Sequence, residues 1–418
     1  MTEENNSAAD GDIIFARQGG LANVTLNRPK ALNALTQPMA IALDDQLRLW
    51  QEDAAVKAVS IQGAAREDGR VPFCSGGDIR FLHEQQNDPH KQFAITFYEQ
   101  EYRLNTLVFR FPKPYVALID GVVMGGGVGI SFHGSHRVMS EHALFAMPET
   151  GIGLFPDVGA TYFLPRCPGR MGLYMGLTGA RIGVADALYL GLATHHVPSA
   201  RMAEFGAALG AADLSGDAAS AIDAVLTGFT ADPGAAPLAA RQDEVDRCFV
   251  GDSIEAILDN LSAEGTPWAE ETHATLMEKS PTSLKITLRQ LTQHNDLDFE
   301  AAMEVEYRMA IRCNFSSEFY EGIRAQIIGN KWTSPGGGLI LSIEIPQTVS
   351  LKKTLRRLAN TQCAHYDFQP GFYGITALAR FERLPLVAQT RDDAPEAGDP
   401  RRGTAQATLN LAVLEFSH

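Results

Sequence analysis

The 418-residue chain is short of cysteine, of positive charge and of long hydrophobic runs. Its five cysteines are scattered and none belongs to a Cys-x-x-Cys pair, which favours a reducing compartment. No uncharged apolar run reaches the ~18 residues of a membrane-spanning helix. Residues 1–12 are acidic and polar, with neither an apolar signal core nor an Arg-rich transit pattern. We therefore expect a cytoplasmic protein that does not enter a membrane.

The charge balance is strongly acidic. There are 35 Lys and Arg against 50 Asp and Glu, a formal net charge of −15, and the basic residues form no run. Because nucleic-acid phosphates would be repelled, this balance argues against a nucleic-acid partner. Hydrophobic residues make up 45% of the chain and charged residues 20%, which is typical of a globular protein that buries a large core.

Two acids occupy an unusually apolar stretch, residues 145–159 (FAMPETGIGLFPDVG). Only apolar residues, Gly, Thr and Pro separate Glu149 from Asp157. Carboxylates among apolar neighbours lose solvation, which raises their pKa and suits them to acid, base or nucleophilic chemistry near neutral pH. The structural alternative is a helix N-cap at Asp157 and a solvated Glu149.

Two glycine clusters precede these acids. Residues 73–78 read FCSGGD, and residues 124–131 read MGGGVGIS after the apolar run 115–119. A strand that passes through glycines into a helix leaves backbone N–H groups free to bind a ligand oxygen, and two such groups form an oxyanion hole. The alternative for each cluster is a tight turn or close helix packing. Cys74 lies in the first cluster, and with no matching histidine we expect it to be a packing residue.

Hydrophobic periodicity predicts an α/β fold. We expect strands over 13–16, 22–26, 56–61 and 115–119, helices over 36–50 and 92–111, and mainly helical structure over 157–191, 205–240 and 266–329. Thr36 and Ser280 are predicted N-caps, the latter followed by Pro281 at the first helical position. His195 and His196 are adjacent on a predicted strand and point to opposite faces, so no metal site is expected.

Together these motifs resemble the crotonase (enoyl-CoA hydratase/isomerase) superfamily, and within it a branch of thioester hydrolases. The resemblance covers residues 12–335 and implies a crotonase-like ββα spiral core over 12–200 with a helical C-terminal region over 201–335. The matching segments are residues 27–35, 75–80, 124–131, 145–159, 177–179, 193–195, 280–287 and 321–325.

The resemblance also implies a chemistry. The backbone N–H groups of Ser75 and Gly126 would hold the thioester oxygen, while Glu149 acts as nucleophile or general base. Hydratases carry a second glutamate where this chain has Gly129, and they lack the acid Asp157. The implied reaction is hydrolysis of 3-hydroxyisobutyryl-CoA, or a close 3-hydroxyacyl-CoA, in valine catabolism. The alternative is an enoyl-CoA hydratase or isomerase with another acyl-CoA substrate.

The same resemblance implies how the substrate is bound. Asp157 would accept a hydrogen bond from the 3-hydroxyl. Separately, because the chain is acidic, local cations must hold the CoA phosphates; Arg28 is the favoured candidate beside Lys30 and Arg80, and the alternative for each is a surface cation. No cofactor is expected beyond the CoA of the substrate, and assembly into a homo-oligomer stays open. The further predicted substrate contacts are Glu101, Gly76, Gly77 and Asp78.

The resemblance stops abruptly after Pro335, where Gly336-Gly337-Gly338 opens a tail of different character over residues 336–418. Residues 391–402 are polar and charged and contain Pro, which predicts partial disorder. Two interpretations compete: an accessory segment, or translation in a shifted reading frame after Pro335. The abrupt loss of the family pattern favours the second.

Overall fold

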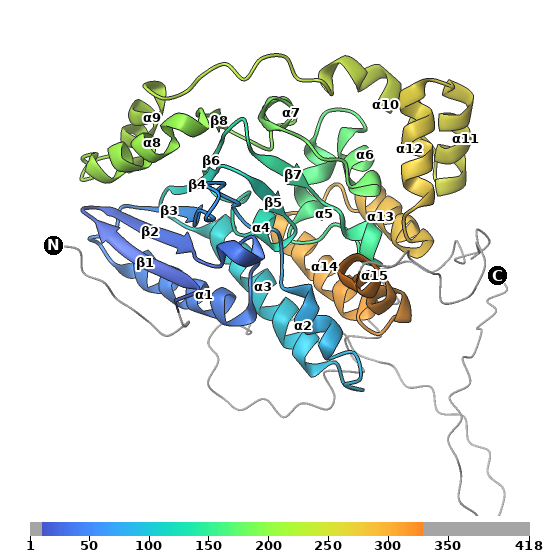
Figure 1. Ribbon diagram of the computed structural model, residues 1–418, viewed down its shortest axis with the longest axis horizontal. Helices are drawn as coiled ribbons and strands as arrows, with labels where there is room; N and C mark the ends of the chain where they lie inside the picture. Colours follow the sequence, from blue (N-terminus) through green and yellow to red (C-terminus); the bar gives the residue numbers. More distant parts are fainter. Residues whose placement is uncertain (1–10, 329–418) are drawn as a thin grey trace, which may run out of the picture. The chain divides into compact units, whose positions relative to one another are not determined.

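The computed structural model describes residues 11–328, so the predicted tail 336–418 lies outside the described residues. A six-stranded sheet forms the body of the N-terminal half (Figure 1). The first two strands pair antiparallel and every later neighbour pairs parallel. In spatial order the strands are β1 (Ile13–Gln18), β2 (Leu21–Leu26), β3 (Ala58–Gly63), β4 (Tyr115–Ile119), β6 (His136–Met139) and β8 (His195–His196).

A small second sheet carries the glycine turns. Strands β5 (Val122–Met124) and β7 (Leu144–Ala146) pair parallel, and isolated bridges join Leu35 to Gly77 and Cys74 to Val123. Each β–β–α unit thus contributes backbone first to the large sheet and then to the small one, as expected for the crotonase-like spiral. Both glycine clusters meet at the small sheet.

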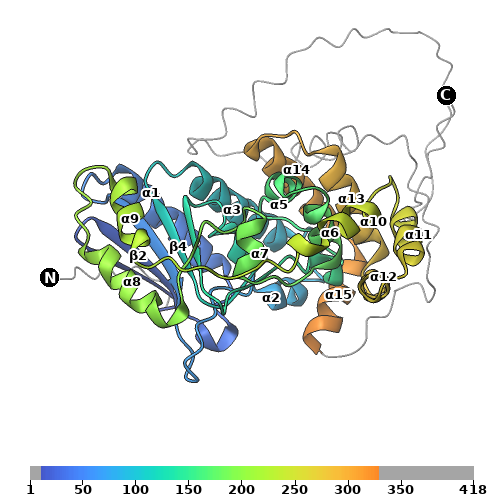
Figure 2. The ribbon, with the colours of Figure 1, turned by 90° about the horizontal axis from the view of Figure 1, so that it is seen from above.

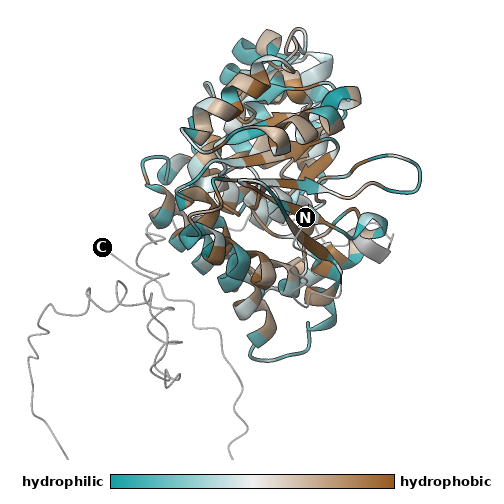
Figure 3. Ribbon diagram, turned by 90° about the vertical axis from the view of Figure 1, so that its left-hand side faces the viewer, coloured by the Kyte–Doolittle hydropathy of each residue, from teal (hydrophilic) through white to brown (hydrophobic). Residues whose placement is uncertain are grey.

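Helices cover both faces of the large sheet because its side chains alternate between them. Val116 and Leu118 of β4 belong to a core shared with α8 (Ser199–Ala211) and α9 (Ala218–Thr227). Ala117 and Ile119 belong to the larger core, shared with α1 (Gln37–Glu52) and α3 (Gln92–Arg110). Hydrophobic residues accordingly concentrate on the strands in Figure 3.

Short helical elements frame the glycine turns and the two acids. Those elements are α2 (Ile79–Glu84), α4 (Gly126–Gly129), η2 (Glu149–Ile152), α5 (Ala160–Phe163), η3 (Leu164–Arg166), α6 (Met171–Thr178) and α7 (Val184–Tyr189), with η1 (Pro29–Ala31) earlier in the chain.

The later helices gather at the end of the fold away from α8 and α9 (Figure 2). Two of them, α13 (Pro281–Gln293) and α14 (Phe299–Cys313), pack on α6 and α3 respectively, beside the segment that carries Asp157. They are η4 (Ala239–Arg241), α10 (Gln242–Cys248), α11 (Ile254–Glu264), α12 (Pro267–Met277), α13 (Pro281–Gln293), α14 (Phe299–Cys313) and α15 (Ser317–Ile328).

Local sequence signals predicted several boundaries well. The Thr36 hydroxyl accepts from Met39 N–H at the start of α1, and the Ser280 hydroxyl accepts from Ser283 N–H at the start of α13. Among residues 11–328, no helix combines the length and the hydrophobicity needed to cross a membrane.

Candidate active site

One cavity of about 820 Å³ receives residues from all the central motifs. Its wall includes the glycine turns at 75–77 and 124–126. Three acids from separate elements also line it: Glu101 from α3, Glu149 at the first residue of η2, and Asp157 from the loop before α5. The fold therefore brings together the two acids and the two glycine clusters that the sequence singled out.

The two glutamates lie against the glycine turn that begins α4. A Cβ built on Gly125 would lie 3.2 Å from Glu149 Oε1, and a Cβ on Gly126 would collide with the Glu101 carboxylate. A side chain at either glycine would therefore displace a carboxylate. Glu101 Oε1 and Glu149 Oε2 accept no hydrogen bond from the described residues, so both keep acceptor capacity for a ligand.

Asp157 has a dedicated hydrogen-bond donor. The Tyr102 hydroxyl, one residue after Glu101 on α3, donates to Asp157 Oδ2 at 2.7 Å. The alternative of an N-cap at Asp157 is wrong, because α5 begins at Ala160 with Gly159 as its N-cap. The side chain is thus free to face the cavity.

Burial dominates the electrostatics of the three acids, which are 2%, 5% and 4% exposed at Glu101, Glu149 and Asp157. Burial, reinforced by the nearby charge of Asp157, raises the pKa of Glu101 and of Glu149 well above the ordinary value. Burial also raises the pKa of Asp157 to about 6, although the Tyr102 hydrogen bond opposes that rise. Like charges this close titrate as a group, so the site retains protons near neutral pH.

One predicted oxyanion donor needs correction. The Ser75 N–H donates to Leu32 O at 3.1 Å, so it is not available to a substrate, although Ser75 still lines the cavity. Gly76, with φ +111°, reverses the backbone, and the next N–H, that of Gly77, donates to no acceptor within residues 11–328.

The second predicted donor is available. Gly126 is the first residue of α4, where no preceding turn supplies a carbonyl to accept its N–H. A Cβ on Gly126 would lie 3.2 Å from the nitrogen of Gly77, so these two backbone segments are adjacent. The geometry therefore pairs Gly77, rather than Ser75, with Gly126.

The predicted role of Arg28 also needs correction. Its guanidinium bonds to Asp78 Oδ2 at 3.1 Å, to Asp12 at 3.3 Å and to Ala34 O at 2.8 Å. Neither Arg28 nor Asp78 lines the cavity, because each neutralises the other between η1 and the 75–78 turn.

The cations that do line the cavity come from later in the chain. Arg181 follows α6 and Lys279 follows α12. The pKa of Lys279 is lowered mainly by burial; the charge of Glu278 opposes this and the charge of Arg181 adds to it. Trp268 of α12 lines the same region.

Comparison with known proteins identifies the family of the chain. A sequence model of the enoyl-CoA hydratase/isomerase family matches residues 21–335. The chain belongs to the enoyl-CoA hydratase/isomerase family. Within this family it is similar to the mitochondrial 3-hydroxyisobutyryl-CoA hydrolase of Xenopus tropicalis, with 42% identity over 327 residues, covering 78% of this chain and 84% of the relative. The human protein of the same name is 40% identical over 322 residues, covering 76% and 82%.

Solved structures of the enoyl-CoA hydratase/isomerase family share the fold. A carnitinyl-CoA dehydratase from Mycobacterium thermoresistibile superposes with a TM-score of 0.73 at 35% identity, covering 86% of this chain and 98% of that one. An enoyl-CoA hydratase from Rhodobacter sphaeroides 2.4.1 has a TM-score of 0.69 at 38% identity, covering 76% and 89%. The predicted fold class is therefore confirmed.

This family member has no room for a second catalytic glutamate on α4. Gly129, the position to which the resemblance assigns that residue in hydratases, packs against the buried Asn105 side chain of α3. A Cβ at Gly129 would lie 2.5 Å from Asn105 Nδ2. Asn105 on α3 and the glycine at position 129 on α4 together leave no space for a glutamate at this position.

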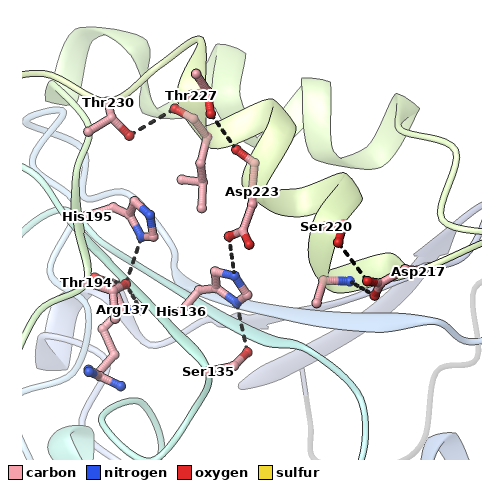
Figure 4. Close-up of polar contacts among 12 residues, drawn as sticks. Ser135, His136, Arg137, Thr194, His195, Asp217, Ser220, Asp223, Thr227 and Thr230 are labelled. Carbon is pink, nitrogen blue, oxygen red and sulfur yellow. Dashed lines mark hydrogen bonds and ion pairs between the residues drawn. The ribbon is translucent and has the colours of Figure 1, made fainter.

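The remaining reactive side chains have structural roles. The Cys74 thiol is buried and donates to Gly76 O at 3.6 Å, and burial raises its pKa to about 12. His195 Nδ1 contacts Thr194 Oγ1 at 2.9 Å, whereas His196 Nδ1 contacts Met139 O at 3.1 Å. Figure 4 shows His195 in a polar network beside α9. Within the described part of the chain, no group of three or more ligand side chains could hold a metal ion.

Sequence reasoning missed the partner of Asp157 and the cavity cations. Tyr98, Glu101 and Tyr102 follow an i, i+3, i+4 spacing that puts them on one helix face, so this signal was present. Arg181 and Lys279 lie about a hundred residues apart and carried no local signal.

Proposed function

We propose that the chain hydrolyses 3-hydroxyisobutyryl-CoA, or a close 3-hydroxyacyl-CoA, to the free hydroxy acid and CoA. The observation that carries the proposal is the cavity that holds Glu149 and Asp157 together while Gly129 leaves α4 without an acid. The similarity to 3-hydroxyisobutyryl-CoA hydrolases over most of the chain supports the choice of substrate. The reaction would then serve valine breakdown and need no cofactor beyond the CoA of the substrate.

The thioester would be activated by backbone donors. With its carbonyl oxygen between the N–H groups of Gly77 and Gly126, the negative charge of the tetrahedral intermediate is stabilised. Loss of one such donor typically costs about 3–4 kcal/mol of transition-state stabilisation. Both segments are held by the small sheet, so this geometry exists before the substrate arrives.

Glu149 would supply the attacking oxygen or activate it. As nucleophile, its carboxylate adds to the thioester carbon and the C–S bond breaks, leaving an acyl-glutamyl anhydride that water then hydrolyses. As general base, it takes a proton from a water that attacks the same carbon. In both routes the CoA sulfur leaves with the bonding electrons and is protonated.

The acid pair Asp157 and Glu101 would select the hydroxylated acyl group. An ionised Asp157, held by the Tyr102 hydroxyl, can accept a hydrogen bond from the 3-hydroxyl, and Glu101 lies on the same helix face as Tyr102. An acyl chain without that hydroxyl would leave a buried acceptor unpaired, which is how polar sites reject such analogues.

Arg181 and Lys279 are the cavity residues suited to the CoA phosphates. They are cationic and line the same cavity as Trp268, whose indole offers an aromatic face for an adenine ring. In a chain with a net charge of −15, such a local pair is needed to hold a polyanion.

The direct test measures free CoA released from 3-hydroxyisobutyryl-CoA, alongside hydration of crotonyl-CoA, for the wild type, Glu149→Ala and Asp157→Ala. We expect rapid release from the hydroxyacyl thioester by the wild type only. Faster hydration of crotonyl-CoA than hydrolysis of the thioester would instead support the hydratase alternative.

The cellular location and the oligomeric state of the chain are two further parts of the proposal. The cytoplasmic location inferred from composition contrasts with the names of the similar amphibian and human proteins, which say mitochondrial. Fractionation of the producing cells distinguishes the two locations. Homo-oligomerisation is tested by the mass of the purified chain in solution.

A further inference from the structure

A fourth buried carboxyl lies behind the loop that carries Asp157. Glu306, on α14, is 0% exposed and does not line the cavity. Its Oε2 accepts from the Gly159 N–H at 2.7 Å and its Oε1 accepts from the Thr161 N–H at 2.7 Å. The two oxygens thus bind the backbone immediately after Asp157.

That backbone has an unfavourable conformation. Val158 has φ +51° and Gly159 has φ +97°. Left-handed backbone is costly for a β-branched residue such as Val158, so it persists only where surrounding contacts enforce it. The loop must therefore be held from outside.

The contacts that hold it come mainly from the C-terminal helices. Gln290 of α13 donates to Pro156 O at 2.6 Å and to Thr161 Oγ1 at 2.8 Å, on either side of Asp157. His133 Nε2 lies 2.7 Å from Val158 O. Among these contacts, Glu306 is the one that accepts from two backbone N–H groups of the loop, those of Gly159 and Thr161.

We propose that Glu306 is a positioning residue for Asp157: by binding the Gly159 and Thr161 N–H groups it fixes the loop so that the Asp157 carboxylate meets both the Tyr102 hydroxyl and the 3-hydroxyl of the substrate. This inference rests on the proposed hydrolase function. It makes the helical region beyond residue 201 part of the selectivity apparatus, although α14 contributes no side chain to the cavity wall.

Two opposing effects act on the charge state of Glu306. Burial raises its pKa to about 8, while the hydrogen bonds from Gly159 and Thr161 oppose that rise. An ionised carboxylate accepts hydrogen bonds at both oxygens, whereas a protonated carboxyl carries a hydrogen on one of them. The two N–H groups favour the ionised state, which predominates only above a pH of about 8, so the kinetic comparison below belongs at about pH 9.

The test compares two thioesters that differ only in the 3-hydroxyl, 3-hydroxyisobutyryl-CoA and isobutyryl-CoA. In Glu306→Gln, the amide NH₂ group faces one of the two N–H donors, so one contact is lost. We expect kcat/KM for the hydroxylated thioester to fall about 10- to 100-fold, as for loss of a hydrogen bond to a charged group. For isobutyryl-CoA it should change less than about 2-fold, since no contact to Asp157 is made.

A double variant tests whether Glu306 acts through Asp157. A residue with a merely structural role would not show this dependence on Asp157. In an Asp157→Asn background, adding Glu306→Gln should produce little further loss on the hydroxylated thioester, because both changes remove the same interaction. Glu304→Gln is the matched control, since Glu304 lies on the same helix, is exposed and pairs with Arg308. Its selectivity should equal that of the wild type.

The outcomes are distinguishable. A wild type that does not hydrolyse 3-hydroxyisobutyryl-CoA removes the proposed function itself. A wild type selective for the hydroxyl, with a folded Glu306→Gln that keeps that selectivity or loses both activities equally, overturns only the role of Glu306. If Glu306→Gln does not fold, Gln290→Met, which removes the donor to Pro156 O, must show the same selective loss.

Discussion

The hydrogen bond from Tyr102 to Asp157 gives a prediction with a definite sign. Both side chains are 4% exposed, and their oxygens are 2.7 Å apart. A hydrogen bond to a charged group contributes about 1.5–3 kcal/mol, which corresponds to a change in pKa of roughly one to two. Tyr102→Phe removes that contribution from the ionised carboxylate alone. The pKa of Asp157, already raised to about 6 by burial, should therefore rise further.

The consequence appears in the pH dependence of kcat/KM for 3-hydroxyisobutyryl-CoA. The proposed role of Asp157 requires its ionised form, which is lost as pH falls through its pKa. A higher pKa moves this loss towards neutral pH, so the acidic limb should shift upwards by about one to two pH units. At pH 6 the variant should be about 5- to 50-fold slower than the wild type, whereas near pH 9 it should recover.

A steady-state titration of kcat/KM between pH 5 and pH 9 measures the shift. Tyr115→Phe is the matched control, because Tyr115 is equally buried but donates to Ile130 O at 2.9 Å rather than to an acid. An acidic limb that stays in place in Tyr102→Phe, or moves to lower pH, would refute the assignment of Asp157 as an ionised acceptor held by Tyr102.

Three further predictions concern the rest of the cavity. Arg181→Gln and Lys279→Gln should each raise KM several-fold for the CoA thioester but not for the pantetheine thioester, which lacks the adenosine phosphates; equal changes for both would exclude phosphate binding. Because burial raises the pKa of Glu149, the folded chain keeps a proton that the unfolded chain releases, and this acid destabilises the fold increasingly as pH rises. Glu149→Gln should therefore raise Tm more at pH 8 than at pH 5, and a larger gain at pH 5 would contradict this. Gly129→Glu should lower Tm without creating crotonyl-CoA hydratase activity, because its Cβ would lie 2.5 Å from Asn105 Nδ2; a stable, active hydratase would show that α3 yields easily.

Local patterns were sufficient for much of the fold. The first two strands, the cap at Thr36 and the start of α3 at Gln92 were all predicted from neighbouring residues. These features depend on turn chemistry, capping and hydrophobic spacing within a few residues. The acids Glu149 and Asp157 were found for a similar reason, since both stand in a stretch too apolar for a solvated loop.

What failed depended on partners distant in sequence. Whether Ser75 or Gly77 offers a free N–H is decided by the carbonyl of Leu32, which lies more than forty residues away in the chain. Arg28 looked available for a phosphate because Asp78, its partner, is fifty residues further on. Glu306 gave no signal at all, since an acid on a long amphipathic helix is normally solvated. Only the packing of α14 against α3 and α5 buries it.

The acids of the cavity connect selectivity to the stability of the empty site. Glu101 and Glu149 each keep an oxygen without a hydrogen bond from the described residues, and burial raises the pKa of both. Unpaired buried acceptors are unfavourable in the folded chain, so a ligand that supplies a donor gains the difference on binding. A 3-hydroxyl supplies such a donor and a plain acyl chain does not. The preference for hydroxylated over plain acyl substrates would therefore come partly from relieving the unfavourable burial of the acids, and not only from the contacts formed with the substrate.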